Sequence, residues 1–382
     1  MKFTPNFYDG PLLAAYNVEL DENGCLNSSR MLKKEQLEEA QTHALEGNLW
    51  FAFMETRGHE DWYNGETYVD TLSKEAMAHF IELTHEKYKA KIGDKFGTVV
   101  PCIFTDEPEF NIMNQLDDPW AKNDVWFAWT RNLLESYTEE YSSNLLEHLP
   151  ELVWNLPDGK PSLARWRYHE HTCERFVSAF MDQLAAWCGK NNLMLNGHMM
   201  EEPSLRSQTN ALGEAMRCYR NMQMPGMDLL VDWMEYNTAK QVSSVGRQNG
   251  LRGAMSELYG VTHWDFTFEG HKGQGDWQAA LGITFRVHHL AWVSMAGEGK
   301  RDYPASIGYQ SPWYKEYGYV EVSLKRRRLP LPVRIFSIFA LEIMCWEDVL
   351  SQDLILLMNH ASAPILLAIA NCTVLIRTIL RG

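Results

Sequence analysis

The sequence lacks the motifs that mark several protein classes. Its seven cysteines include no Cys-X-X-Cys pair, and their scattered, odd number argues against a disulfide framework. We therefore expect reduced thiols and a cytoplasmic protein. No Gly-X-Gly-X-X-Gly follows a predicted strand and no P-loop occurs, so nucleotide binding has no motif to support it. The first residues hold no apolar run of the length that a secretory signal needs, which also favours the cytoplasm.

Positive charge is also scarce. The chain has 35 basic and 50 acidic residues, a net charge of −15, and such a surface repels phosphate backbones. We therefore expect no nucleic-acid partner. The longest uncharged stretch, residues 354–376, contains two asparagines, a histidine and a proline, so we do not expect it to span a membrane.

The composition is otherwise that of a globular protein with a sizeable core. Of 382 residues, 45% are hydrophobic, and Trp, Tyr and Phe number 14, 16 and 16. This aromatic excess has two interpretations: large core residues, or flat platforms for the apolar faces of sugars.

Composition changes abruptly near residue 323. Residues 323–382 carry seven basic and four acidic residues, contain no tyrosine, and include one of the 25 glycines. We predict a catalytic region over residues 1–322 and an atypical apolar and basic tail over residues 323–382. A frameshift or truncation would explain such a tail. The oligomeric state is left open.

Short apolar strands alternate with helical segments along the first 322 residues. We expect strands in residues 49–58, 99–104, 192–198, 226–232, 253–257 and 287–293, a turn at Asp21–Gly24, and a helix capped by Ser73. This alternation is typical of a parallel sheet with covered faces, in either an α/β barrel of the (β/α)8 TIM type or a doubly wound sheet.

Acidic residues and histidine gather just after the predicted strands. They are Asp106, Glu107, His198, Glu202, Asp232 and Glu257. In parallel α/β folds these positions meet at one edge, where active sites lie. Two carboxyl groups from different strands are what glycosidic bond cleavage needs. The alternative is that these acids are solvent-facing or form structural ion pairs.

The loop that follows Glu257 is rich in aromatic and acidic side chains. Trp264, Asp265 and Trp277 lie there, and an aromatic ring flanked by acids suits a sugar. The alternative is a rigid loop held by its own rings. The histidine pairs, at 169 and 171 and at 288 and 289, have the wrong spacing to share a metal, so we predict no metal site from spacing.

Several segments together resemble bacterial glycoside hydrolases of the α-L-rhamnosidase type, glycoside hydrolase family 106 and its uncharacterised relatives. They are TYVDTLSKEAM, FTDEPEF, GHMMEEPSL, MDLLVDW, the long run from SELYG through DWQ to YPASI, and YQSPWYKEY. The resemblance covers about residues 10–321, and the SELYG run is its most specific part.

This resemblance implies a (β/α)8 barrel that cleaves a terminal α-L-rhamnose or a similar deoxysugar, with calcium assisting. By position, Glu107 would be the acid and Glu257 the base or nucleophile, with Glu202 near the sugar. Asp106, His198, Asp232, Trp264, Asp265 and Trp277 would line the carbohydrate site.

The chain departs from the family at both ends. If residues 49–58 form barrel strand 3, no sequence remains for strands 1 and 2, so we expect an incomplete barrel. Two other hypotheses stay open: a catalytically inactive remnant that at most binds carbohydrate, and a barrel hydrolase for another sugar, such as a β-galactosidase-like enzyme. The stereochemical outcome is also open.

Overall fold

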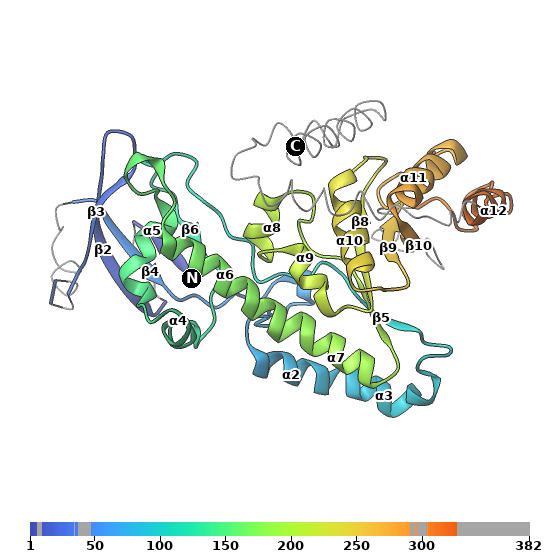
Figure 1. Cartoon of the computed structure of the whole chain (residues 1–382), viewed down its shortest axis with the longest axis horizontal. Coiled ribbons are helices and arrows are strands. Elements are labelled where there is room, and N and C mark those ends of the chain that lie inside the picture. The colour runs from blue at the N-terminus through green and yellow to red at the C-terminus, as the bar shows by residue number, and fades with distance from the viewer. Residues whose placement is uncertain are drawn as a thin grey trace, which may run out of the picture. The chain divides into compact units, whose positions relative to one another are not determined.

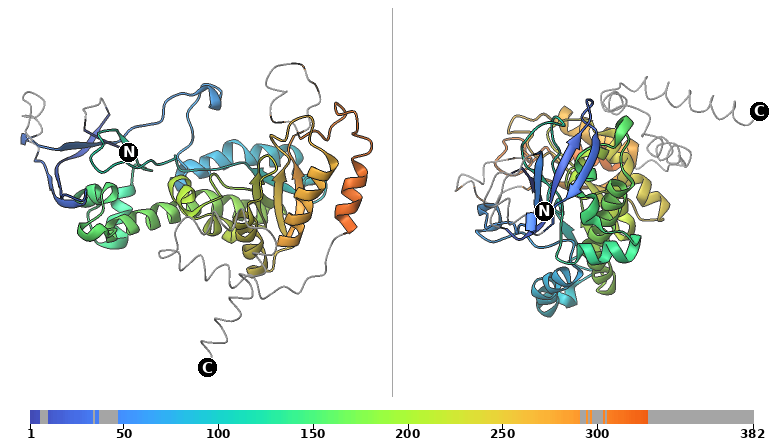
Figure 2. Two further views of the ribbon diagram at one scale, coloured as in Figure 1. Left: turned by 90° about the horizontal axis from the view of Figure 1, so that it is seen from above. Right: turned by 90° about the vertical axis from the view of Figure 1, so that its left-hand side faces the viewer.

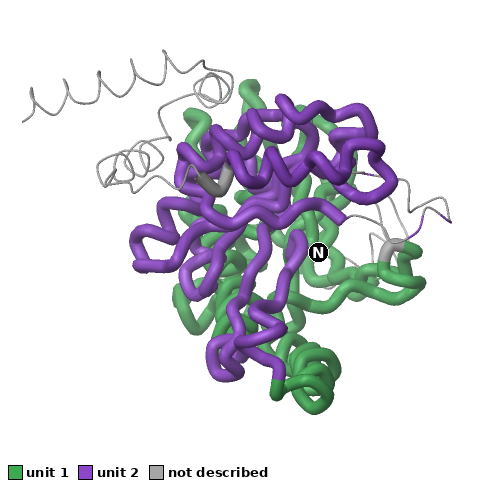
Figure 3. The backbone as a smooth tube through the Cα atoms, turned by 90° about the vertical axis from the view of Figure 1, so that its right-hand side faces the viewer, with its two compact units in different colours: residues 1–94, 109–186, 206–214 green, residues 95–108, 187–205, 215–382 purple. Residues whose placement is uncertain are grey.

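The structure, a computed structural model, describes residues 1–5, 10–33, 35–36, 47–290, 294, 296, 303 and 305–326. The chain divides into two units (Figure 3). Unit 1 comprises residues 1–94, 109–186 and 206–214, and unit 2 comprises residues 95–108, 187–205 and 215–382. Each unit contains a sheet of its own.

The sheet of unit 1 is antiparallel. Its strand order is β3-β2-β4-β1-β6, with bounds β1 Lys2–Thr4, β2 Leu12–Leu20, β3 Leu26–Met31, β4 Leu49–Phe53 and β6 Val125–Trp126. β2 and β3 form a hairpin (Figure 2), and the predicted turn at Asp21–Gly24 is confirmed. Gly24 adopts φ +76°, which a glycine tolerates without strain.

The assignment of residues 49–58 to a barrel strand is wrong. β4 lies inside the antiparallel sheet, between β1 and β2. A continuous apolar run predicts burial on both faces, which a central antiparallel strand also has. Trp50 is fully buried, stacks on Phe3 at 5.2 Å between ring centroids, and meets Trp154 edge-on at 5.1 Å. Part of the aromatic excess is therefore core.

Helices make up most of the rest of unit 1. The predicted N-cap is confirmed, because the Ser73 side chain accepts a hydrogen bond from the amide of Ala76. The helix that Ser73 caps ends at Leu83, and after Thr84 a second helix begins at His85. Among the described residues before 194, the helices are α2 Lys74–Leu83, α3 His85–Ile92, α4 Leu133–Tyr141, α5 Leu149–Val153, α6 Leu163–Phe176, the π-helix η5 Val177–Met181 and α7 Asp182–Lys190. Short 3₁₀ turns are η1 Asp61–Tyr63, η2 Gly93–Lys95, η3 Leu145–His148 and η4 Pro157–Gly159.

The sheet of unit 2 is parallel throughout (Figure 1). Its order is β10-β9-β8-β7-β5, with bounds β5 Cys102–Thr105, β7 Met194–Gly197, β8 Met224–Leu229, β9 Ala254–Leu258 and β10 Ile283–His288. Between and after these strands lie α8 Leu205–Ala211, α9 Ala215–Cys218, η6 Tyr219–Asn221, α10 Tyr236–Gln248, α11 Phe268–Leu281 and α12 Gly318–Arg326.

Strand order distinguishes the two predicted architectures. The five strands lie side by side in chain order with no reversal, whereas a doubly wound sheet reverses direction at a switch point. α10 packs on β8 and β9, and α11 packs on β10, as in one arc of a barrel. The mixed α/β class and the parallel sheet are confirmed. The described strands form an open sheet and do not close into an eight-stranded barrel.

One glycine allows the close approach of β5 and β7. Gly197 has φ +131°, and a Cβ built there would lie 1.9 Å from the carbonyl oxygen of Thr105. Only glycine fits this position without moving the backbone. The carboxyl ends of the two strands, which precede Asp106 and His198, therefore lie next to each other.

Two predictions concern residues outside the described part of the chain: the end of the strand expected over residues 287–293, and the tail. Residues 327–382, which hold most of the predicted tail and all of its uncharged stretch, are among them, so a division at residue 323 stays a prediction. Within the described residues, every helix is too short or too polar to traverse a bilayer.

Candidate active site

Four acidic residues and one histidine of unit 2 gather at the carboxyl end of its sheet. Asp106 and Glu107 follow β5, His198 follows β7, Asp228 lies near the end of β8, and Glu257 lies near the end of β9. Parallel strands bring these positions to one edge, as the alternation of strands and helices predicted. We call these five residues the acidic cluster.

His198 is the centre of the acidic cluster. The imidazole is fully buried, and its Nε2 lies 2.9 Å from Glu257 Oε2 and 3.5 Å from Asp106 Oδ1. Ligand atoms of Glu107, His198 and Asp228 also lie within 4.8 Å of one another. One imidazole thus faces carboxyl groups from three other strands.

These carboxylates decide the protonation of His198. Burial on its own lowers the pKa of the imidazole, but the hydrogen bond that the ring donates to Glu257 and the charges of Glu202 and Asp228 outweigh it and raise the pKa to about 9. At neutral pH the ring is therefore an imidazolium, and it donates its Nε2 proton to the Glu257 carboxylate.

Glu107 has the opposite tendency. Burial raises its pKa, the His198 charge lowers it, and the neighbouring charges of Asp106 and Glu257 raise it further. Glu107 therefore holds its proton to higher pH than an ordinary glutamic acid does. Glu107 and Glu257, the two catalytic carboxyl groups predicted from the sequence, thus lie in different environments.

A further buried carboxyl group lies beside the acidic cluster. Glu202 Oε1 accepts hydrogen bonds from the Met199 amide and the Tyr219 hydroxyl, both at 2.7 Å, and Oε2 accepts one from the Asp228 amide at 3.2 Å. Burial raises the pKa of Glu202 to about 7, and burial likewise raises that of Asp228 to about 7. Glu202 fixes the loop after β7 to the end of β8.

The backbone of the loops around this edge is strained. Glu107 has φ 45°, Val231 φ 55° and Tyr259 φ 74°, in the left-handed region that residues with a side chain seldom adopt. These residues follow β5, β8 and β9 at the same end of the sheet. Strain of this kind gathers at sites where side-chain direction matters more than local stability.

The sequence missed Asp228. We expected the strand to run over residues 226–232 and placed Asp232 at its end, but β8 ends at Leu229. The residue that joins the acidic cluster is therefore Asp228, the third residue of the predicted strand. A shorter strand, of the length seen in its neighbours, would have revealed it.

The structure places the remaining predicted residues on the loops after β8 and β9 and on a helix. Asp232 follows β8, and Trp264 and Asp265 lie in the loop between β9 and α11, with Asp265 exposed. Trp277 lies in α11, where its ring meets Tyr236 of α10 edge-on at 5.5 Å and its indole nitrogen donates to Gln274 at 2.7 Å. The Trp277 ring therefore contributes to the contact between two helices.

The acidic cluster does not have the donor set of a calcium site. Among the described residues, each group of side chains close enough to share a metal contains His198. Calcium is bound by oxygen ligands, and a protonated imidazole repels it. The His198 imidazolium itself supplies the positive charge between the carboxylates.

Comparisons with known proteins concern the fold alone. No protein-family model matches the chain, and no curated protein matches its sequence. Among solved structures, the rhamnosidase from Novosphingobium sp. PP1Y is similar over 72% of this chain, with a TM-score of 0.52 and 17% sequence identity. The match spans 26% of the rhamnosidase, so the matched part of this chain corresponds to about a quarter of that protein. The matched 72% of the chain thus has a rhamnosidase-like fold.

Proposed function

We propose that the chain is a glycoside hydrolase that cleaves a terminal deoxysugar such as α-L-rhamnose. The observation that carries the proposal is the pair Glu107 and Glu257, which lie at the same edge of one parallel sheet with His198 between them. Their environments differ as those of an acid and a base do. The likeness of the fold to a structure named rhamnosidase supports the choice of sugar.

Glu107 is the general acid of this proposal. It donates its proton to the glycosidic oxygen as the bond to the leaving group breaks. This role requires a carboxyl group that holds its proton to higher pH than usual, which is the direction in which burial shifts the pKa of Glu107. Glu107 has φ 45° and the proline that follows has no N–H to donate, so the backbone leaves the sheet ladder at this residue.

Glu257 acts at the anomeric carbon. The hydrogen bond from His198 Nε2 fixes the direction of its carboxylate. An ionised carboxylate here either attacks the anomeric carbon or removes a proton from water, and either role stabilises the positive charge that develops on the sugar ring. His198 is a positioning residue, because it acts through Glu257.

Residues around the acidic cluster would bind the sugar hydroxyls and rings. The Asp106 side chain is 73% exposed, so it is free to accept hydrogen bonds from a substrate. Asp232, Trp264, Asp265 and Trp277 remain predicted substrate contacts, and Glu202 supports the site by linking the loop after β7 to the end of β8.

Leaving-group dependence tests the assignment of Glu107. Glu107→Gln removes the proton donor, so hydrolysis of 4-methoxyphenyl α-L-rhamnoside, whose leaving group needs protonation, should slow about 10²–10⁴-fold. Hydrolysis of the 2,4-dinitrophenyl glycoside should slow far less. The exposed Glu269→Gln at the start of α11 serves as the control.

The opposite outcomes have clear meanings. Equal loss on both substrates contradicts the role of Glu107 as acid. If the unaltered chain cleaves aryl β-D-galactosides and not α-L-rhamnosides, the choice of sugar is wrong. Protection by sugar against unfolding, without turnover of any aryl glycoside, contradicts the hydrolase and favours the carbohydrate-binding alternative.

A further inference from the structure

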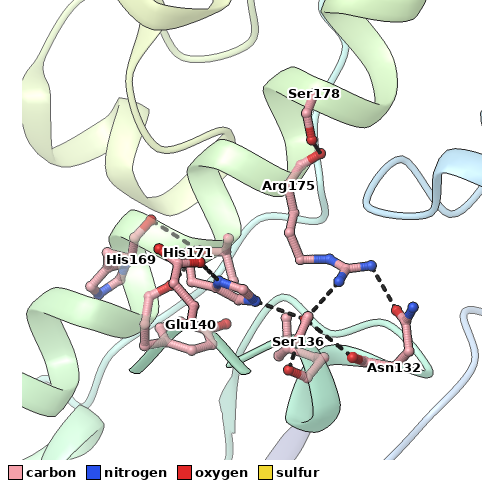
Figure 4. A network of polar contacts seen from close by, with 10 residues as sticks. Asn132, Ser136, Glu140, His169, His171, Arg175 and Ser178 are labelled. Atoms are coloured by element: carbon pink, nitrogen blue, oxygen red, sulfur yellow. Dashed lines mark hydrogen bonds and ion pairs between the residues drawn. The ribbon is translucent and has the colours of Figure 1, made fainter. Parts of the chain in front are cut away.

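Unit 1 contains a polar cavity that the proposed glycosidase does not use. The cavity has a volume of about 450 Å³, within the range of small-molecule sites, and Leu72 is its one apolar lining residue. It lies between α2, α4 and α6, and all of its lining residues belong to unit 1. Figure 4 shows the side chains that meet there.

Three of these side chains form a hydrogen-bonded chain. Ser136 Oγ lies 2.8 Å from His171 Nε2, and His171 Nδ1 lies 2.7 Å from Glu140 Oε2 (Figure 4). Ser136 and Glu140 are four residues apart on α4, so both face α6, which carries His171. A hydroxyl, an imidazole and a carboxylate in this order are the parts of an activated serine nucleophile.

The carboxylate settles which nitrogen of His171 carries the proton. Glu140 can only accept a hydrogen bond, so Nδ1 is protonated and Nε2 presents its lone pair to Ser136. The Ser136 hydroxyl also lies 3.1 Å from the carbonyl oxygens of Asn132 and Leu133, so rotation about Cβ–Oγ moves its proton between these oxygens and Nε2. The tautomer is the one that a general base requires.

The surroundings favour a neutral imidazole. Burial lowers the pKa of His171, Glu140 raises it, and Arg175 lowers it. The rings of Tyr137 and Tyr141 meet the imidazole edge-on at 5.7 and 5.9 Å and hold it in place. The charged side chains that line the same cavity are Lys74 and Glu75 of α2, Glu139 and Glu140 of α4, and Arg175 of α6.

Arg175 adds a fixed positive charge at the hydroxyl. Its Nη1 donates to Ser136 Oγ at 2.7 Å and its Nη2 to Asn132 Oδ1 at 2.6 Å (Figure 4). Nη2 also donates to the Leu72 carbonyl oxygen at 3.1 Å. A cation at this place favours the negative charge that a serine oxygen and a carbonyl oxygen acquire during attack. The π-helix η5 begins two residues later, and such segments often occur at functional sites.

We propose that Ser136, His171 and Glu140 form a second active site, which hydrolyses small hydrophilic carboxylic esters. The polar lining excludes long acyl chains, and the charged donors of the cavity suit the carbonyl and hydroxyl groups of an acylated polyol. The proposal is independent of the glycosidase proposal, because the two sites share no residue.

The reaction follows from the hydrogen-bonded chain. Ser136 Oγ attacks the ester carbonyl carbon while His171 Nε2 takes the hydroxyl proton. His171 then gives this proton to the leaving alcohol oxygen as the C–O bond breaks, which leaves an acyl-serine. Water attacks the acyl carbon, its proton passes to His171, and the carboxylic acid leaves as the proton returns to Ser136 Oγ.

Two measurements on the full chain test the proposal. The chain should hydrolyse 4-nitrophenyl acetate and glycerol triacetate, and Ser136→Ala should lower kcat/KM at least about 10²-fold. Thr138→Ala, which removes an exposed hydroxyl from the same helix, should retain the rate. In addition, diethyl 4-nitrophenyl phosphate should phosphorylate Ser136, as identified by mass spectrometry of its peptide.

The contradicting results are equally specific. Equal rates in the unaltered chain and a folded Ser136→Ala variant overturn the proposal, as does phosphorylation at a residue other than Ser136 or at none. If Ser136→Ala does not fold, the labelling of the unaltered chain decides the matter. Loss of rhamnoside cleavage alone concerns the acidic cluster and leaves this test unaffected.

Discussion

Replacing Glu202 by glutamine should change how the stability of the chain depends on pH. Glu202 is 4% exposed, and burial raises its pKa from 4.5 to about 7. The folded state therefore binds a proton more tightly than the unfolded state. The contribution of Glu202 to the free energy of unfolding is therefore complete below about pH 4.5 and is lost as the pH rises through about 7. Glutamine cannot titrate, so the variant lacks this dependence.

The magnitude follows from the shift in pKa. A shift from 4.5 to about 7, at about 1.4 kcal/mol for each unit of pKa, corresponds to about 3 kcal/mol. Between pH 4.5 and pH 8 the unaltered chain should lose about 3 kcal/mol of unfolding free energy relative to Glu202→Gln. The glutamine amide beside the Asp228 N–H can also change the unfolding free energy by an amount that does not depend on pH. Such an amount cancels when the change in unfolding free energy between the two pH values is compared.

Urea unfolding followed by tryptophan fluorescence at several pH values measures this difference. Glu269→Gln, which changes an exposed carboxylate, should follow the unaltered chain at every pH. A difference between the unaltered chain and Glu202→Gln that is constant with pH would refute the reasoning. A difference of opposite sign would mean that the three hydrogen-bond donors outweigh burial.

Other changes at the same edge of the sheet have equally definite outcomes. Gly197→Ala places a Cβ 1.9 Å from the Thr105 carbonyl oxygen, so it should destabilise the chain by more than about 4 kcal/mol, whereas Gly58→Ala, which enters open space, should have little effect. Equal melting temperatures for the two variants would contradict the packing argument. Asp106→Asn removes a negative charge that raises the pKa of Glu107, so the alkaline limb of kcat/KM for an aryl rhamnoside should move to lower pH. An unchanged limb, or a move to higher pH, would mean that another group controls it.

Local features of the fold could be predicted from the sequence because they depend on neighbouring residues. The Ser73 cap and the turn at Asp21–Gly24 are of this kind, since side-chain or backbone hydrogen bonds within four residues determine them. The short strands of unit 2 and the acids that follow them were also predictable. Parallel strands of this kind place Asp106, His198 and Glu257 at one edge.

Features that depend on long-range pairing could not be predicted in the same way. Leu49–Phe53 is apolar throughout, and such a run fits the centre of either kind of sheet, so its antiparallel partners decide its place. The ends of strands could be predicted only to within a few residues. For this reason the sequence pointed to Asp232 at the end of β8, whereas the residue in the acidic cluster is Asp228. Ser136 and His171 are 35 residues apart on different helices, and only the packing of α4 near α6 brings them into contact.

The most direct test of the central claim is the rate at which the full chain releases 4-nitrophenol from 4-nitrophenyl α-L-rhamnoside, with and without Glu257→Gln. The claim predicts measurable turnover by the unaltered chain and a loss of kcat/KM of at least about 10³-fold in the variant, because the amide cannot act at the anomeric carbon. Equal kcat/KM in the unaltered chain and a folded Glu257→Gln variant would contradict the claim that the acidic cluster cleaves the glycosidic bond.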